Sequence, residues 1–300
     1  MTRSKLWIGI DGGATKTIAR IEDDAGQLIG IGKSGSANIR WDATGAWGSI
    51  LAAIEAALHQ TGIKWGDRTY EWCCGAGLAG TQVPEACDHF RQIDHPCNCF
   101  AQLELHSDGY ISCLGAHGGA DGAVIAIGTG VVAYQIEGKA AVRVSGWGFP
   151  QGDEGSGAWL GLQAVGQTFQ WQDGRSAGSA LTEAVLAQFE HNFTQFMVWA
   201  NGATSKDFAA IAPLVIQQAQ AQDPSAIALM QQAATEIDKI WQALVSQQRQ
   251  PLPCSLLGGL APALEPWLSE GLRSRLVPAQ EDAARGAILM IRQNASRETS

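Results

Sequence analysis

Three glycine turns are the first places where this sequence could do chemistry, because each comes directly after an apolar segment. They are Asp11-Gly12-Gly13, Gly128-Thr129-Gly130 and Gly258-Gly259. Glycine permits tight turns and lets a ligand approach the backbone closely. Any one of them alone also fits an ordinary connection between elements. Together they predict a cradle of backbone N–H groups for a triphosphate. The polar side chains available to the same cradle are Thr15, Lys16, Thr17 and Thr129.

The first turn differs from the familiar phosphate loops in the element to which it leads. The segment "WIGIDGGATKT", residues 7–17, has neither the G-x-x-x-x-G-K-[ST] pattern nor the G-x-G-x-x-G pattern. Those loops lead into a helix, whose N-terminus holds the anion. Here residues 15–35 show no helical period and predict a strand, a turn at Asp24-Ala25-Gly26 and another strand. The first turn is therefore predicted to be the tip of a β-hairpin.

Asp11 needs an explanation, because an aspartate beside a phosphate site repels the ligand unless a cation lies between them. Mg²⁺ in proteins binds through one or two carboxylates, water molecules and substrate phosphates. Asp11 is therefore expected to hold the water molecules of a bound magnesium nucleotide. The alternative is an Asx turn, in which the carboxylate simply closes the hairpin.

Composition restricts the classes of protein to consider. The 300 residues are 46% hydrophobic and 16% charged, with a formal net charge of −9. This acidic balance argues against nucleic-acid binding, which needs a basic face, and no apolar run reaches the roughly 18 residues of a membrane span. Scattered cysteines and the lack of signal-peptide features predict reduced thiols and a cytoplasmic protein. A small-molecule enzyme and a protein-binding module both fit, and homodimerisation is left open.

The elements that must position these turns repeat within the chain. Residues 122–148 predict an apolar strand, a small-residue loop, a strand, a turn and a strand, in the same order as residues 6–33. We interpret this order as an internal duplication that places two hairpin tips across a cleft from each other. The other predicted strands cover residues 69–78, 97–103 and 275–277, with one more directly before Gly258. The predicted helices are one capped by Asp42 or Thr44 and ending at Gly62, one over 84–92, one after residue 108, several over 155–248, one over 262–271 and a last one over 281–295.

This order of parts resembles the sugar kinase, heat-shock protein and actin superfamily. Within it the chain is similar to the N-acetylglucosamine kinase and BadF/BadG-type ATPase group, and most of all to bacterial glucosamine kinases. "GIDGGATKT" matches the first phosphate motif, "AIGTG" the second and "LLGGLAP" the adenosine motif. "SGSANI", "DGYISCLGAH" and "GWGFPQGDEGSGAWLG" match the sugar-side and connecting motifs. The resemblance covers nearly the whole chain, and it departs at Ala14, where many relatives have a third glycine.

The resemblance implies an α/β, two-lobed, actin-like ATPase fold of the ribonuclease H-like kind, in which each lobe is a mixed sheet with flanking helices. The smaller lobe would cover residues 1–110, completed by a C-terminal helix over 281–296, and the larger lobe residues 111–280. The implied activity is an ATP- and Mg²⁺-dependent kinase that converts D-glucosamine to glucosamine 6-phosphate, with N-acetylglucosamine as the alternative substrate. An ATPase that activates a partner iron–sulfur enzyme and a non-catalytic amino-sugar sensor are the rival functions.

The resemblance also implies roles for single residues. Asp108 would be the general base for the sugar 6-hydroxyl, although its position also suits a helix N-cap. Asn38 and Asp153 would hydrogen-bond sugar hydroxyls, although Asn38 also suits a turn. The residues expected beside them at the sugar are Thr129, Gly146, Trp147 and Gly148. Those expected at ATP and its phosphates are Asp11, Gly12, Gly13, Thr15, Lys16, Thr17, Gly128, Thr129, Gly130, Gly258 and Gly259.

One cluster of metal-ligand residue types falls outside these motifs. It comprises His89, His95, Cys97 and Cys99. The spacing is not that of a zinc site, so buried thiols in a strand are the favoured explanation and metal binding is left open. Cys73, Cys74 and most of the eleven tryptophans are expected in the core, with Trp147 as the exception.

Overall fold

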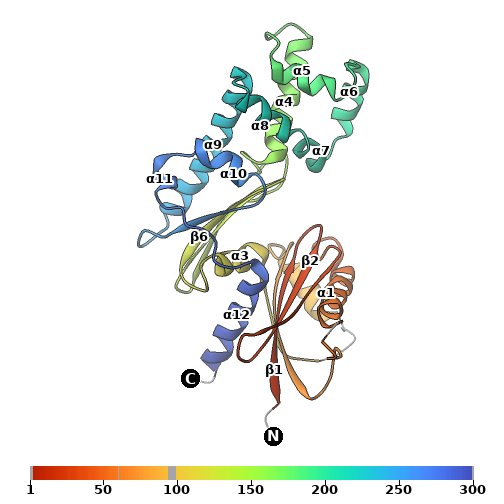
Figure 1. Ribbon diagram of the computed structural model, residues 1–300, viewed down its shortest axis with the longest axis vertical. Coiled ribbons are helices and arrows are strands. Elements are labelled where there is room, and N and C mark those ends of the chain that lie inside the picture. The colour runs from red at the N-terminus through yellow and green to blue at the C-terminus, as the bar shows by residue number, and fades with distance from the viewer. Residues whose placement is uncertain (1–2, 60, 94–98, 299–300) are drawn as a thin grey trace. The chain divides into compact units, whose positions relative to one another are not determined.

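The computed structural model describes residues 3–59, 61–93 and 99–298, with side chains as far as residue 295, and it divides into two compact units (Figure 1). The first unit contains Met1–Gly122, Gln135–Ala141 and Pro278–Ser300, and the second contains Ala123–Tyr134 and Val142–Val277. Each unit has its own sheet and its own hydrophobic core. The lobe boundaries expected after residue 110 and before residue 281 stay a prediction.

The first unit is built on a five-stranded mixed sheet with the order β3-β2-β1-β4-β5. β1 to β3 form an antiparallel meander, whereas β4 and β5 continue the sheet in parallel with β1. Parallel strands end at the same edge of a sheet, so the carboxyl ends of β1, β4 and β5 lie together. The strands are β1 Ser4–Gly12, β2 Thr17–Asp23, β3 Leu28–Ser34, β4 Tyr70–Leu78 and β5 Phe100–Ser107.

Helices cover the two faces of this sheet, and side chains of β1 alternate between them. Ile8 and Ile10 join the core beneath α1, whereas Trp7 packs with Ile288 and Ile291 of α12. Glycines in the strands let both helices approach closely, because a Cβ at Gly9 or Gly32 would overlap the backbone of α12 or α1. The helices of this unit are α1 Ala43–Leu58, α2 Pro84–Gln92, α3 Asp108–Ala116 and α12 Ala283–Glu298.

The second unit repeats the strand arrangement of the first. Its sheet has the order β8-β7-β6-β9, in which β9 pairs in parallel with β6. In both sheets three consecutive strands lie side by side, and a later strand pairs in parallel with the first of the three. The later strand is β4 beside β1 in the first unit and β9 beside β6 in the second. This is the order that an internal duplication predicts. The strands are β6 Gly122–Ile127, β7 Val131–Glu137, β8 Ala140–Ser145 and β9 Cys254–Leu257.

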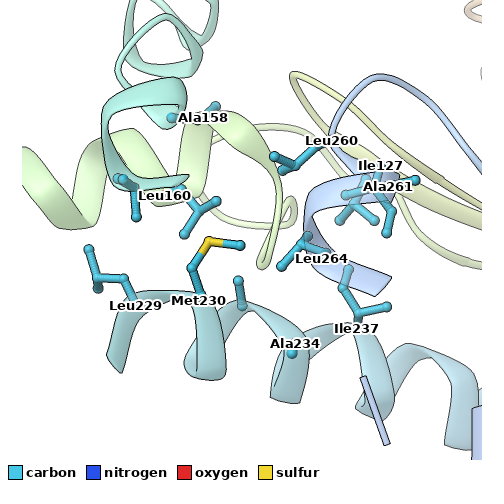
Figure 2. Close-up of a cluster of buried hydrophobic side chains, with 14 of the residues drawn as sticks. Ile127, Ala158, Leu160, Leu229, Met230, Ala234, Ile237, Leu260, Ala261 and Leu264 are labelled. Carbon is cyan, nitrogen blue, oxygen red and sulfur yellow. The ribbon is translucent and has the colours of Figure 1, made fainter. Parts of the chain in front are cut away.

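A helical layer completes the second unit. Figure 2 shows Leu229, Met230, Ala234 and Ile237 of α9 directed toward Leu160 and Leu264 in its core. Ile127 belongs to the same core, so the loop after β6 starts from a fixed point. The helices are α4 Gly157–Gln172, α5 Ala180–Ala187, α6 Phe193–Gly202, α7 Ser205–Ala209, α8 Ala212–Gln220, α9 Pro224–Val245, α10 Ala261–Leu264, the 3₁₀-helix η1 Glu265–Trp267 and α11 Glu270–Arg273.

Three of the predicted elements have different bounds. α1 ends at Leu58 and not near Gly62, because Thr61 donates two hydrogen bonds to the Leu58 carbonyl and closes the helix. The helix expected over 262–271 is broken into α10, η1 and α11, because Pro266 lacks the N–H that would continue it. The strand expected over 275–277 is a single bridge between Leu276 and Cys254.

The strand expected over 97–103 also begins later than predicted. β5 starts at Phe100, so Cys99 precedes it in a turn, and Cys97 lies outside the described residues. In the ranges that the structure describes, no helix has the length and apolar character needed to cross a membrane.

Candidate active site

The first glycine turn is the tip of the hairpin formed by β1 and β2, as the sequence predicts. Gly13 closes the tip by donating to the carbonyl of Lys16 at 2.9 Å and accepting from Ala37 at 3.1 Å. Gly12 has no room for a side chain, because a Cβ there would lie 2.9 Å from the Cβ of Ala37. Glycine is therefore needed at Gly12 for the tip to dock on the loop after β3. Thr15 and Lys16 remain exposed on the tip.

Thr17 has a different role from the one expected. Its side chain is fully buried, and its hydroxyl donates to the Gly35 carbonyl at 2.7 Å. A hydroxyl committed to the fold in this way does not fit the expected contact with a phosphate. Thr17 instead ties the start of β2 to the loop that carries Asn38.

Asp11 lies at the carboxyl end of β1, opposite Ile18 of β2 and Gly77 of β4. Burial raises the pKa of its carboxyl group to about 6, the charges of Asp108 and Asp282 raise it as well, and Lys16 lowers it. No N–H group in the described parts of the chain donates to this carboxylate, so the Asx turn is not formed. A partly desolvated carboxylate near other carboxylates would be stabilised in its ionised form by a divalent cation.

Asp108 is the first residue of α3 and comes directly after β5. The N-cap of this helix is Ser107, whose Oγ accepts from the Tyr110 N–H at 3.2 Å, so Asp108 is not the cap. Its Oδ1 accepts from the Gly109 N–H at 2.8 Å, which orients the carboxylate. Since the charge of Asp108 acts on the pKa of Asp11, the two carboxyl groups share one electrostatic environment.

Asn38 lies in the loop after β3, and its Oδ1 accepts from the Arg40 N–H at 3.1 Å. The turn role is therefore real, but it uses only the acceptor of the amide. The residue lines a hollow of about 380 Å³ in the first unit. Trp41, which none of the sequence motifs indicates, lines the same hollow with 76% of its surface exposed. The full lining is Ala14, Ser36, Asn38, Trp41, Asp42, Gly45, Ala46 and Ser49.

The second glycine turn is the tip between β6 and β7, again as predicted. Gly128 donates to the carbonyl of Gly130 at 2.9 Å and accepts from the N–H of Gly157, at the start of α4, at 2.8 Å. The neighbouring Ala158 N–H donates to the carbonyl of Thr129 at 3.1 Å. The first turn of α4 therefore holds this loop in place, while the Thr129 side chain stays exposed.

The third glycine turn lies beside the second. Gly258 has a φ of 90°, and a Cβ there would overlap the backbone of Ile127. Leu260 donates to the Ile127 carbonyl at 3.1 Å. Because β6 and β9 are parallel neighbours, both turns are placed at the same edge of the second sheet.

Asp153 is attached to the second glycine turn. Its Oδ1 accepts from the Val131 N–H at 3.3 Å, and a Cβ at Gly130 would lie only 2.9 Å from its Oδ2. Burial raises the pKa of this carboxyl and Glu154 adds to the effect, whereas the Val131 N–H and Arg143 act in the opposite direction. Trp147 lies outside the core, in the loop before Asp153, with 77% of its surface exposed; its place at a sugar pocket stays a prediction.

Each unit thus collects residues that are far apart in the sequence. The edge of the first sheet carries Asp11, the hairpin tip and Asp108, and the edge of the second carries two glycine turns and Asp153. Of the separate His and Cys cluster, His95 and Cys97 lie outside the described residues. In the rest of the chain no three His, Cys, Asp or Glu side chains are grouped closely enough to hold a metal ion. Cys73 and Cys74 are buried, as predicted.

Comparison with known proteins extends these observations. The family described as the BadF/BadG/BcrA/BcrD ATPase family matches residues 8–290. The chain is 35% identical over 283 residues to glucosamine kinase GspK of Vibrio cholerae, covering 94% of both proteins. It is 24% identical over 309 residues to an N-acetylmuramic acid/N-acetylglucosamine kinase of Clostridium acetobutylicum, covering 96% of this chain and 98% of that protein.

A solved structure is also similar over the whole chain. A candidate N-acetylglucosamine kinase from Chromobacterium violaceum has a TM-score of 0.85 and 37% identity, covering 96% of this chain and 99% of that one. With the two mixed sheets and their flanking helices, this similarity confirms the expected two-lobed, actin-like ATPase fold.

Proposed function

The chain belongs to the BadF/BadG/BcrA/BcrD ATPase family, and from this membership we propose that it is an ATP-dependent kinase of an amino sugar. D-Glucosamine is the proposed substrate, and glucosamine 6-phosphate is the product. The observation that carries the proposal is the pair of Asp11 and Asp108 at one edge of the first sheet. Phosphoryl transfer requires positioning, charge neutralisation and a carboxylate that accepts a proton, and this pair provides two of the needed groups.

Asp11 is the residue proposed to hold Mg²⁺, through water molecules. Its buried carboxyl has a raised pKa beside Asp108, so the donor set fits a hard cation that binds oxygen ligands. When bound, the magnesium nucleotide supplies the phosphoryl group. The groups proposed to contact its phosphates are the backbone of Gly12, Gly13, Gly128 and Gly130, and the side chains of Thr15, Lys16 and Thr129, while Gly258 and Gly259 receive the adenosine.

Asp108 is proposed as the general base. The hydrogen bond from the Gly109 N–H fixes the orientation of its carboxylate at the first turn of α3. In this role Asp108 accepts the proton of the sugar 6-hydroxyl as the oxygen attacks phosphorus. The helix N-cap is provided separately by Ser107, which leaves Asp108 available for chemistry.

Sugar hydroxyls are proposed to bind Asn38 in the first unit and Asp153 in the second. Asn38 uses its carbonyl oxygen in the turn, and its amide group can donate to a hydroxyl oxygen. Asp153, an acceptor, suits hydroxyl donors, and the Gly146–Gly148 backbone with Trp147 would line the same surface.

The choice of glucosamine is supported by the name of the Vibrio cholerae relative at 35% identity. N-Acetylglucosamine is the second candidate, because the Clostridium and Chromobacterium relatives are described as kinases that act on it. The two sugars share the 6-hydroxyl and differ at carbon 2, which carries an ammonium group in one and an acetamide in the other.

Steady-state ATP consumption tests the proposal directly. The purified chain is assayed with glucosamine, N-acetylglucosamine, glucose and no sugar, and kcat/KM is compared. We expect the highest value with glucosamine, together with stoichiometric glucosamine 6-phosphate by mass spectrometry. A higher value for N-acetylglucosamine would change the substrate. ATP turnover that no sugar stimulates would favour the activating ATPase, and sugar binding with no turnover would favour a sensor.

A further inference from the structure

Arg143 makes a set of contacts that the proposed function does not use. It lies on β8, and its guanidinium donates to the carbonyl of Gly146 and lies 5.0 Å from the ring centroid of Trp147. Gly146 has a φ of 75°, and a Cβ there would lie 2.9 Å from Nη2 of Arg143. The guanidinium therefore fills the inner side of the turn that leads into the Gly146–Gly148 loop.

This loop closes on itself a few residues later. Gly152 donates to the carbonyl of Gly148 at 2.8 Å and accepts from the Trp147 N–H at 3.3 Å. The Ser145 hydroxyl also donates to the Gly152 carbonyl, at 3.2 Å. Asp153 is the next residue, so a group that fixes the start of the loop also fixes the point from which Asp153 extends.

We propose that Arg143 is a positioning residue that pre-forms the sugar-side surface of the second unit. It holds Trp147 and the Gly146 carbonyl in one arrangement before the ligand arrives, so that binding does not have to order the loop. A guanidinium suits this task because its planar fork can donate to a carbonyl while its face stacks on an indole. The inference rests on the proposed function only in taking this loop as sugar-binding.

Kinetics of Arg143→Met test the consequence for binding. Arg175→Met is the matched control, because Arg175 is an exposed residue of the same unit whose side chain forms an ion pair with Asp173. For Arg143→Met we expect KM for the sugar to rise about ten-fold, KM for ATP to stay unchanged and kcat to change less than KM for the sugar. The control should match the wild type in all three. A sugar KM equal to that of the control would overturn the inference.

The pH dependence of kcat/KM for the sugar separates a specific effect of Arg143 on Asp153 from a general loss of order in the loop. The groups that act on the Asp153 carboxyl are Glu154, Arg143 and the backbone N–H groups of Val131 and Phe149. Loss of the Arg143 charge raises the pKa of Asp153, so the acidic limb of kcat/KM for the sugar should move to higher pH. Arg143→Lys keeps the charge and should restore the limb, while the loss of stacking should leave KM elevated. If the acidic limb of kcat/KM lies at the same pH in Arg143→Met as in wild type, the positioning role of Arg143 is contradicted.

Order at Trp147 provides a readout that needs no turnover. Acrylamide quenching of Trp147 is obtained as the difference between each protein and its Trp147→Phe counterpart. We expect stronger quenching in Arg143→Met than in wild type.

If the wild type phosphorylates no amino sugar, the proposed function fails while quenching still tests Arg143. If the wild type is active but Arg143→Met alters neither quenching nor KM, only the inference on Arg143 fails. Should Arg143→Met not fold, Arg143→Lys is compared by the same quenching measurement, and quenching equal to that of wild type overturns the inference.

Discussion

Asp11 lies where folding and chemistry make opposite demands. Its carboxyl has a pKa near 6 in the folded chain, against an ordinary value of 3.8, chiefly because burial disfavours the charged form. A folded-state pKa above the unfolded value means that ionisation opposes folding. The opposition is complete above pH 6, decreases as pH falls, and is absent below about pH 4, where both states are protonated.

We therefore predict that Asp11→Asn stabilises the ligand-free protein at pH 8. The expected gain is about 1–3 kcal/mol, since one pKa unit corresponds to about 1.4 kcal/mol. It should shrink toward zero at pH 4, and phosphorylation should be lost at every pH. Thermal unfolding across this pH range measures the effect. Asp88→Asn, which changes an exposed aspartate, is the control, and its stability should equal that of wild type. A variant that is less stable than wild type at pH 8 would contradict the prediction.

Asp108 and Ser107 are adjacent residues with separable roles. We predict that Asp108→Asn lowers kcat about 10²- to 10⁴-fold, the usual contribution of a general base, because an amide cannot accept the proton. KM for the sugar should change little. Ser107→Ala should instead cost about 1 kcal/mol of stability by removing the cap, with kcat largely retained. Wild-type turnover by Asp108→Asn would remove Asp108 from the mechanism.

At the scale of elements, α12 is fixed to the first hairpin by a buried charge. Glu22 of β2 is fully buried, and its carboxylate accepts from Arg20 at 2.8 Å and from Arg285 of α12. Arg292, further along the same helix, donates to the Asp23 carbonyl and stacks 4.9 Å from the Trp7 ring. The chain's last helix and its first strands therefore depend on one another.

Breaking this network should destabilise the protein strongly. We predict that Glu22→Ala costs about 3–5 kcal/mol, because Arg285 and Arg20 would lose a buried counter-charge. Glu71→Ala removes the half-exposed ion pair with Lys5 at the edge of the sheet's core and should cost less than about 1 kcal/mol. Urea denaturation of both variants provides the comparison. Equal losses would show that the Glu22 network contributes no more than a surface pair.

The sequence predicts the elements where the signals are local. The hairpin after Gly13 is recognisable because residues 15–35 lack a helical period, and α2 has the predicted bounds because Pro84 opens it. The docking of α12 could not be predicted in this way. Glu22 resembles an outward-facing strand residue, and its partner Arg285 lies more than 260 positions away. Gly9 and Gly32 likewise give no local sign that a helix rests on them.

The positions of the candidate site residues in the fold follow from the sequence to a similar extent. Its motifs locate Asp11, Asp108 and Asp153, because each comes after a strand or a glycine loop. The motifs could not separate Ser107 from Asp108 as the cap, since both residue types suit that position. The motifs also assign Thr17 to the phosphates, whereas its buried hydroxyl bonds Gly35. They do not indicate Arg143 or Trp41. The hydroxyl of Thr17 bonds a carbonyl that lies 18 residues away in the sequence, and the contacts of Arg143 with Gly146 and Trp147 depend on the shape of the turn between them.

At the scale of the whole molecule, the duplicated arrangement divides the proposed ligand contacts between the two units. The first unit carries Asp11, Asp108 and Asn38, and the second carries both later glycine turns and Asp153. Each unit has a separate core, so each could lose its structure by itself in the absence of a ligand. A ligand stabilises the unit whose folded form it binds, by mass action.

Ligand-dependent unfolding tests this division. We predict that Mg²⁺–ATP and glucosamine each raise the melting temperature, because a ligand at 100 times its Kd adds about 2.7 kcal/mol to the folded state. EDTA should abolish most of the increase that ATP gives and leave the increase from the sugar. Asp11→Asn should reproduce the EDTA result, since it removes the residue proposed to hold the magnesium. Asp153→Asn should instead lose the sugar increment and keep that of Mg²⁺–ATP. If both variants lost both increments, the ATP and sugar contact sets would not be separable, and the separate roles proposed for Asp11 and Asp153 would be wrong.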